Sequence, residues 1–137
     1  MDGDSALTEV VIGAAIQVHR ALGAGLLESA YEACLAHELT KQGVPVQRQV
    51  ECPVRYDGLL LDAGYRLDLL VADKLVVELK ATDKLLPIHL AQVLTYLRLR
   101  DAPVGLLLNF NTVRLTDGIR RVINAQAPRP PRPPRFN

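Results

Sequence analysis

The chain has 137 residues, of which 49% are hydrophobic and 23% are charged, and its formal net charge is +1. A chain of this length buries roughly two-thirds of its unfolded surface as one domain, so we expect it to fold without disulfide bonds. Its N-terminus is acidic where a signal peptide would be basic, and no apolar run approaches the ~20 residues that cross a bilayer. These features argue against a membrane partner and predict a cytoplasmic protein.

Two helices are expected at the start of the chain. Residues 5–21 carry apolar side chains at helical spacing, which predicts an amphipathic helix that faces the core. Two glycines interrupt the pattern at residues 22–25. A second helix is predicted over residues 26–42, because Gly43 and Pro45 follow it.

The middle of the chain alternates like strands. We expect strands over residues 46–56 and 59–72, joined by a tight turn at Asp57-Gly58, and a further strand over residues 75–81. Pro87 then opens a helix over residues 88–100, residues 104–109 form a buried strand, and Thr116 caps a last helix to residue 124. The predicted order is ααβββαβα, in a single domain over residues 1–126.

The basic charge is concentrated towards the C-terminus. Residues 1–97 contain 8 Lys and Arg against 13 Asp and Glu, net −5, whereas residues 98–137 contain 8 against 2, net +6. Residues 127–137 alternate proline and arginine, which forbids helix and sheet and predicts a disordered arm. Such an arm either contacts phosphates or only keeps the protein in solution, and the pattern does not decide between the two.

The strongest chemical signal is an acid at Asp68, a second acid at Glu78 and a lysine at Lys80. Side chains alternate along a strand, so Glu78 and Lys80 share one face. In so apolar a run these charges need a partner, and two carboxylates on neighbouring strands suit a hard cation such as Mg²⁺. With a lysine beside them they form a minimal set for metal-assisted phosphodiester hydrolysis. Surface hairpins often carry such charged residues too, so the spacing alone does not exclude an ordinary surface hairpin without a metal site.

Strand parity tests this interpretation. A two-residue turn at residues 73–74 would place Asp68 and Glu78 on opposite faces of the sheet, where they could not share an ion. We therefore predict an odd turn or a bulge between residues 68 and 78. That register puts Asp68, Leu70, Ala72, Val76, Glu78 and Lys80 on the active face. It leaves Leu67, Leu69, Val71, Leu75, Val77 and Leu79 as a wholly apolar second face.

The helix after these strands adds polar groups. Gln92 and Tyr96 lie four residues apart and share one face, with His89 on the same stripe. For either residue alone, a core tyrosine or a surface glutamine is the simpler interpretation.

Together, Asp68, Glu78-Leu-Lys80 and Gln92-Val-Leu-Thr-Tyr96 resemble the PD-(D/E)XK nuclease superfamily with the Gln-x-x-x-Tyr helix of RecB-type exonucleases. Upstream, Gly25-Leu-Leu-Glu-Ser-Ala-Tyr31 is similar to the signature of the GxxExxY proteins. Leu67 stands where the superfamily pattern has proline, and Ala24 where we expect proline in this family; neither position supplies a ligand.

The resemblance implies a restriction-endonuclease-like α/β core, a central mixed sheet flanked by helices. It implies that Asp68, Glu78 and Glu28 are metal ligands and that Lys80 is the catalytic lysine. Gln92 and Tyr96, with Tyr31 and His89 nearby, would hold substrate or order the site. The predicted function is a Mg²⁺- or Mn²⁺-dependent exonuclease acting on DNA. The alternatives are a module that binds nucleic acid or protein without cutting, and a nuclease subunit of a homo-oligomer or larger assembly.

Overall fold

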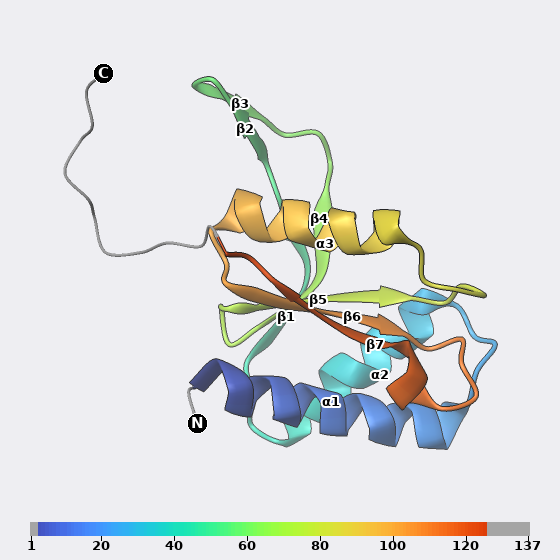
Figure 1. Cartoon of the computed structure of the whole chain (residues 1–137). Helices are drawn as coiled ribbons and strands as arrows, with labels where there is room; N and C mark the ends of the chain where they lie inside the picture. The colour runs from blue at the N-terminus through green and yellow to red at the C-terminus, as the bar shows by residue number, and fades with distance from the viewer. Residues whose placement is uncertain (1–2, 126–137) are drawn as a thin grey trace.

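The computed structural model describes residues 3–125. A five-stranded mixed sheet lies between two layers of helices, with α1 and α2 against one face and α3 against the other (Figure 1). The helices are α1 (Gly3–Leu22), α2 (Glu28–Lys41) and α3 (Pro87–Arg100), with a 3-10 turn η1 (Leu115–Gly118). The strands are β1 (Val46–Glu51), β2 (Val54–Tyr56), β3 (Leu59–Leu61), β4 (Arg66–Val71), β5 (Leu75–Lys80), β6 (Val104–Asn109) and β7 (Ile119–Ile123). The predicted α/β architecture is confirmed.

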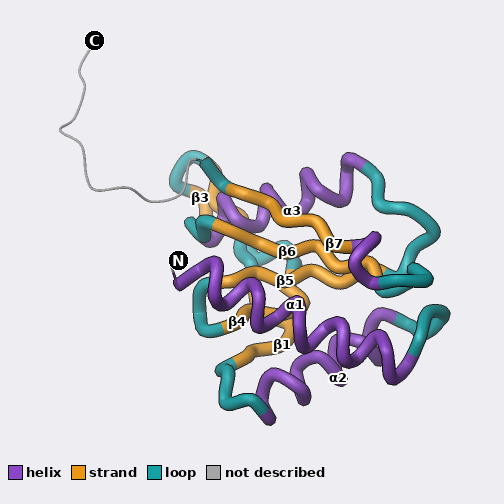
Figure 2. The backbone as a smooth tube through the Cα atoms, turned by 60° about the horizontal axis from the view of Figure 1, so that its bottom comes forward, coloured by secondary structure: helices purple, strands orange, loops and turns teal. Residues whose placement is uncertain are grey.

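The sheet has the strand order β1-β4-β5-β6-β7, which Figure 2 shows with α1 lying across it. β5 and β6 are parallel and are joined by the crossover helix α3, while the other neighbours are antiparallel. β2 and β3 pair only with each other and form a hairpin that projects beyond α3 (Figure 1). Because helices cover both faces of the sheet, its central strands β5 and β6 are buried on both sides, as their nearly continuous apolar sequences require.

The two N-terminal helices form where their sequence periodicity predicts them. Val11, Ala14, Ala15 and Val18 lie on the buried stripe of α1 and pack against the sheet in one core cluster. Gly23 and Gly25 in the linker have φ values of +73° and +99°, which residues with a side chain rarely adopt. The linker thus turns the chain sharply enough for α2 to lie beside α1.

The β4–β5 hairpin has the predicted odd turn. Val71 pairs with Leu75, so three residues form the turn, and Ala72 and Asp73 both adopt positive φ values of 51° and 58°. In this register Asp68 stands opposite Glu78. The ladder itself ends one step earlier, at the pair of Leu69 with Val77. The two strands therefore separate at the acidic pair.

This separation overturns one detail of the predicted faces. Leu67 was expected on the apolar face with Leu69, but it packs with Leu70 and Val76 in the cluster beneath α3. Asp68 pairs in neither the β1–β4 nor the β4–β5 ladder, so the side-chain alternation of β4 is interrupted there. The face with the acids is also partly covered, because α3 packs over Leu70 and Val76.

Two predicted strands are each divided. The first ends at Glu51 and resumes at Val54, because Pro53 cannot donate to a ladder. The second is interrupted at residues 62–65. Between them, Asp57 and Gly58 have φ values of 50° and 79°, the geometry of a type I′ hairpin turn, which confirms the predicted turn.

The predicted last helix is wrong. Residues 115–118 make only the short turn η1, and residues 119–123 form β7, which pairs antiparallel with β6. Ile119, Val122 and Ile123 are β-branched and pair along the open edge of β6, which outweighs the capping signal of Thr116. The predicted order ααβββαβα therefore ends in a strand. The arginine–proline arm predicted over residues 127–137 lies outside the described residues.

Candidate active site

Asp68 and Glu78 meet where β4 and β5 separate. The carboxylate oxygen Oδ2 of Asp68 accepts a hydrogen bond of 2.9 Å from the backbone N–H of Leu79, so it occupies the place of a missing ladder bond. Glu78 is only 4% exposed. The pKa of Glu78 is raised from 4.5 to about 9, chiefly by burial and secondly by the neighbouring Asp68 carboxylate. The geometry thus brings the two predicted acids together and keeps one of them protonated at neutral pH.

This acid pair fits a divalent cation. Two carboxylates held next to each other repel when both are ionised, and either a proton or a cation relieves the repulsion. Oxygen donors of this kind suit Mg²⁺ or Mn²⁺. A cation bound by Asp68 and Glu78 would replace the proton that Glu78 otherwise retains.

Lys80 lies at the end of β5 and is held from α3. Its Nζ donates a hydrogen bond of 3.0 Å to Gln92 Oε1, and Gln92 Nε2 donates one of 3.2 Å to the hydroxyl of Tyr96. The pKa of Tyr96 is raised, chiefly by burial and secondly by the nearby Glu78 carboxylate. Gln92 and Tyr96 of the predicted stripe therefore reach Lys80, and Gln92 orients its ammonium.

Glu28 stands at the rim of this group. It is the first residue of α2, and its Oε1 accepts a hydrogen bond of 3.3 Å from the backbone N–H of Ala81, just after β5. Its charge contributes to the raised pKa of Glu78. Even so, no three His, Cys, Asp or Glu side chains within residues 3–125 gather closely enough to hold a metal ion. Asp68 and Glu78 form a close pair, and Glu28 lies beside it.

Tyr31 and His89 have other roles in this structure. Tyr31 is fully buried, stacks on Phe110, donates to the carbonyl of Gly23 at 2.6 Å and accepts from the N–H of Leu26 at 3.1 Å. It fixes the α1–α2 linker, and its predicted part in holding substrate stays a prediction. Nδ1 of His89 accepts the backbone N–H of Leu86 at 2.9 Å and so caps α3, and its contact with substrate stays a prediction.

Several polar residues at the site were missed by the sequence analysis. Asn109 is buried and bonds both the N–H and the carbonyl of Thr82, which fixes the chain that leaves β5. Glu32, Arg48 and Gln49 form a hydrogen-bonded group beside Asp68. The one available signal was helical spacing, because Glu32 lies four residues after Glu28 on the same face of α2.

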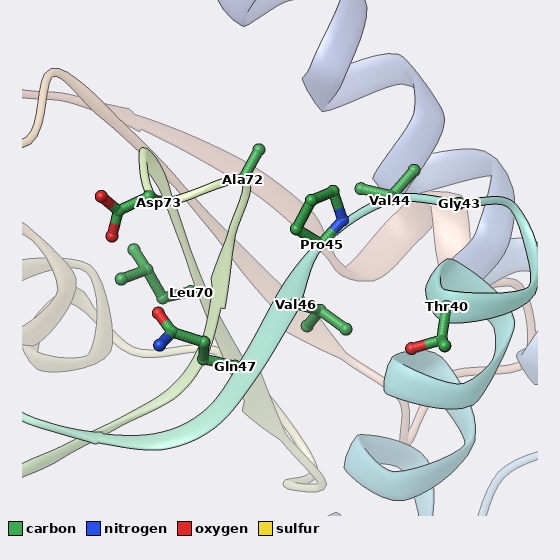
Figure 3. Close-up of a pocket in the computed structure, with 9 residues that line it drawn as sticks. All are labelled: Thr40, Gly43, Val44, Pro45, Val46, Gln47, Leu70, Ala72 and Asp73. Carbon is green, nitrogen blue, oxygen red and sulfur yellow. The ribbon is translucent and has the colours of Figure 1, made fainter.

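An open hollow of about 660 Å³ lies beside Asp68 and Glu28, whereas Glu78 does not line it. Its lining joins the start of α2 to β1 and β4 and includes Glu28, Glu32, Gln49 and Asp68. A larger hollow of about 890 Å³ lies at the other end of the β4–β5 hairpin, between the α2–β1 loop and the turn (Figure 3). Asp73 is the one ionisable residue among those that line this larger hollow, so it offers no comparable chemistry.

Comparison with protein families identifies a superfamily for this chain. A family model described as the PD-(D/E)XK nuclease superfamily matches residues 5–122, nearly the whole described chain. The chain belongs to the PD-(D/E)XK nuclease superfamily. No curated protein and no solved structure gives a significant match.

Membership explains the arrangement of the sheet. The superfamily consists of nucleases, which hydrolyse phosphodiester bonds of nucleic acids and generally use divalent metals. In this member the acids lie where β4 and β5 separate, and the lysine follows two residues after the second acid.

None of the described helices is long and apolar enough to cross a bilayer.

Proposed function

We propose that this chain is a Mg²⁺- or Mn²⁺-dependent deoxyribonuclease of the RecB-like exonuclease type. The observation that supports this best is the buried Glu78 carboxyl, with a pKa raised to about 9, directly beside Asp68 and two residues from Lys80. A purely structural hairpin would not gain from holding two acids together in an apolar sheet. A cation site accounts for their arrangement.

Asp68 and Glu78 would hold the cation, and Glu28 would add a third carboxylate from the rim. When bound, the ion would polarise the scissile phosphate and make a water molecule a better nucleophile. The carboxylates of this chain set where that chemistry occurs, because backbone bonds already fix Asp68 and Glu28 from Leu79 and Ala81. Mg²⁺ keeps several waters in such sites, so few protein ligands suffice.

Lys80 would act on the attacking water and on the charge that builds on the phosphate. Its ammonium donates to Gln92, which fixes it in position before substrate arrives. A fixed cationic donor stabilises developing negative charge more than a mobile one, since no reorganisation is needed during the reaction. Gln92 and Tyr96 therefore act mainly through the lysine, and His89 would contact substrate from the start of α3.

Cleavage of labelled DNA tests this proposal. The purified protein should degrade linear single- or double-stranded DNA with Mg²⁺ or Mn²⁺, and EDTA should stop the reaction. Closed circular DNA should resist, since an exonuclease needs an end. The Glu78→Ala variant should be inactive because it lacks the carboxyl that would hold the ion, and it should stay folded because alanine places no charge in the buried site.

The outcomes separate the alternatives. Activity that persists in EDTA would refute the metal-dependent function. Binding of DNA without cleavage under every metal condition would identify a binding module. Cleavage of closed circular DNA would support a nuclease but indicate an endonuclease instead of an exonuclease.

The two free cysteines, Cys34 and Cys52, favour the cytoplasmic location in which such an enzyme would meet DNA.

A further inference from the structure

Gln49 interrupts the edge strand β1 opposite the acid Asp68. Within this described strand, Val46, Gln47, Arg48, Val50 and Glu51 each pair with a residue of β4, while Gln49 does not. The register on both sides places Asp68 across from it. Its φ value is +53°, in the left-handed region that residues with a side chain seldom adopt. The backbone therefore leaves the extended form here and redirects the side chain.

The redirected side chain joins two carboxylates. Nε2 of Gln49 lies 2.6 Å from Glu32 Oε1 and 3.4 Å from Asp68 Oδ1. Ionised carboxylate oxygens only accept hydrogen bonds, so the NH₂ end of the amide must face both of them. One amide hydrogen serves each acid, and Gln49 becomes a bridge from α2 to the site.

Glu32 anchors this bridge. It is 6% exposed, and its second oxygen, Oε2, accepts from Arg48 Nε at 3.0 Å. A buried carboxylate needs such donors, because an unpaired charge away from water is costly. With Arg48 and Gln49 on its two oxygens, Glu32 is bound within the protein and serves to hold Gln49.

Asp68 is thereby held at both oxygens. Oδ1 receives the Gln49 amide, and Oδ2 receives the Leu79 N–H at 2.9 Å. We propose that Gln49, fixed by Glu32, is a positioning residue that orients the Asp68 carboxylate towards Glu78 before any cation binds. This inference rests on the proposed function. It assigns to the edge strand a part in the site that the acids and lysine alone do not supply.

Loss of the bridge should free the carboxylate to rotate. Hydrogen-bond partners that orient metal ligands typically contribute 10–100-fold to metal affinity or activity. The Gln49→Leu variant removes the amide and leaves a side chain of similar size. Gln49 is exposed, so the variant should fold. We expect about 10–100-fold weaker Mn²⁺ binding and a similar fall in kcat, with KM for DNA changed by less than about threefold.

A readout without metal tests the same contact. The Leu79 N–H is held by Asp68, so its hydrogen exchange, followed by ¹⁵N NMR in the metal-free protein, should accelerate in Gln49→Leu. Gln47→Leu is the matched control, because it changes the same residue type on the same strand. Arg48→Leu is the structural control, since it removes a donor to Glu32 without touching Asp68. Gln47→Leu should retain the wild-type exchange rate at Leu79 and the wild-type affinity for Mn²⁺. Arg48→Leu should lose less of both than Gln49→Leu, because the Gln49 amide keeps its contacts with Glu32 and Asp68.

Three results decide the proposal. Wild-type exchange and Mn²⁺ affinity in Gln49→Leu, with an active wild type, would overturn the positioning role and leave the nuclease intact. Equal losses in Arg48→Leu would overturn it too, because general support of the Glu32 group would then explain the effect. A wild type that neither binds Mn²⁺ nor cleaves DNA would refute the proposed function, and the positioning role would fail with it.

Discussion

Binding of a divalent ion should release a proton from Glu78. In the metal-free protein, burial and the neighbouring Asp68 raise the pKa of Glu78 from 4.5 to about 9. At pH 7 such a carboxyl is only about 1% ionised, so an ion must first displace its proton. The apparent Mn²⁺ affinity should therefore increase about tenfold for each pH unit below 9, or about 100-fold between pH 6 and pH 8.

Calorimetry measures this linkage directly. Titration of Mn²⁺ in two buffers of different ionisation enthalpy gives the number of protons released, which should be close to one per ion at pH 7. The Glu78→Gln variant is the control, because its amide has no proton to release. Its weaker binding should not vary with pH. A wild-type affinity that is constant from pH 6 to pH 8, without proton release, would refute the assigned environment of Glu78.

The same shift predicts how stability depends on pH. The folded pKa of Glu78 lies above its unfolded value, so its protonated form stabilises the fold fully below pH 4.5. This contribution is lost as the pH rises towards 9. The free energy of unfolding of the metal-free wild type should therefore fall relative to Glu78→Gln between pH 5 and pH 9, and saturating Mn²⁺ should reverse the loss. If the difference in unfolding free energy between wild type and Glu78→Gln stayed constant with pH, it would contradict the raised pKa of Glu78.

Lys80→Met should lower kcat by roughly 10²–10⁴-fold while DNA affinity in a gel-shift titration stays nearly unchanged, and an equal collapse of binding would reassign the lysine to phosphate anchoring. Tyr31→Phe should cost about 1–3 kcal/mol in urea unfolding, because the N–H and the carbonyl in the linker lose their partner. A loss of kcat without loss of stability would instead indicate that Tyr31 acts in the active site. Gly118→Ala should destabilise the fold by about 1–3 kcal/mol in the same assay, since its Cβ would collide with the Asn109 carbonyl oxygen, and unchanged stability would contradict that close packing. Deletion of residues 128–137 should reduce the slope of log affinity against log salt by up to about 3 if the tail arginines contact phosphates; an unchanged slope would leave the tail no part in binding.

The register of the central hairpin shows how far the sequence alone could reach. Side-chain alternation and the requirement that Asp68 and Glu78 share a site together forced an odd turn, and the structure has three residues there. The same local logic located both N-terminal helices, α3, β6 and the Asp57-Gly58 turn. It also paired Gln92 with Tyr96, because four-residue spacing on a helix depends on no distant contact.

Other features depend on which segments become neighbours. Residues 119–123 form a strand because the edge of β6 is open to them, and no local signal reveals that edge. Leu67 changes face because both ladders of β4 are interrupted at Asp68. Propensity within a segment cannot predict either result, since both follow from pairing between strands.

The sequence by itself determined the chemistry available to this protein: an acid pair, a lysine two residues on and the helix that follows. The tertiary structure decided how those groups are held. Burial beneath α3 and against Asp68 makes Glu78 a weak acid, and α2 brings Glu32 to Gln49 so that the edge strand reaches Asp68. Desolvation and hydrogen bonds between distant segments exist only once the layers have packed, which is why periodicity and spacing could name the acids but not their state.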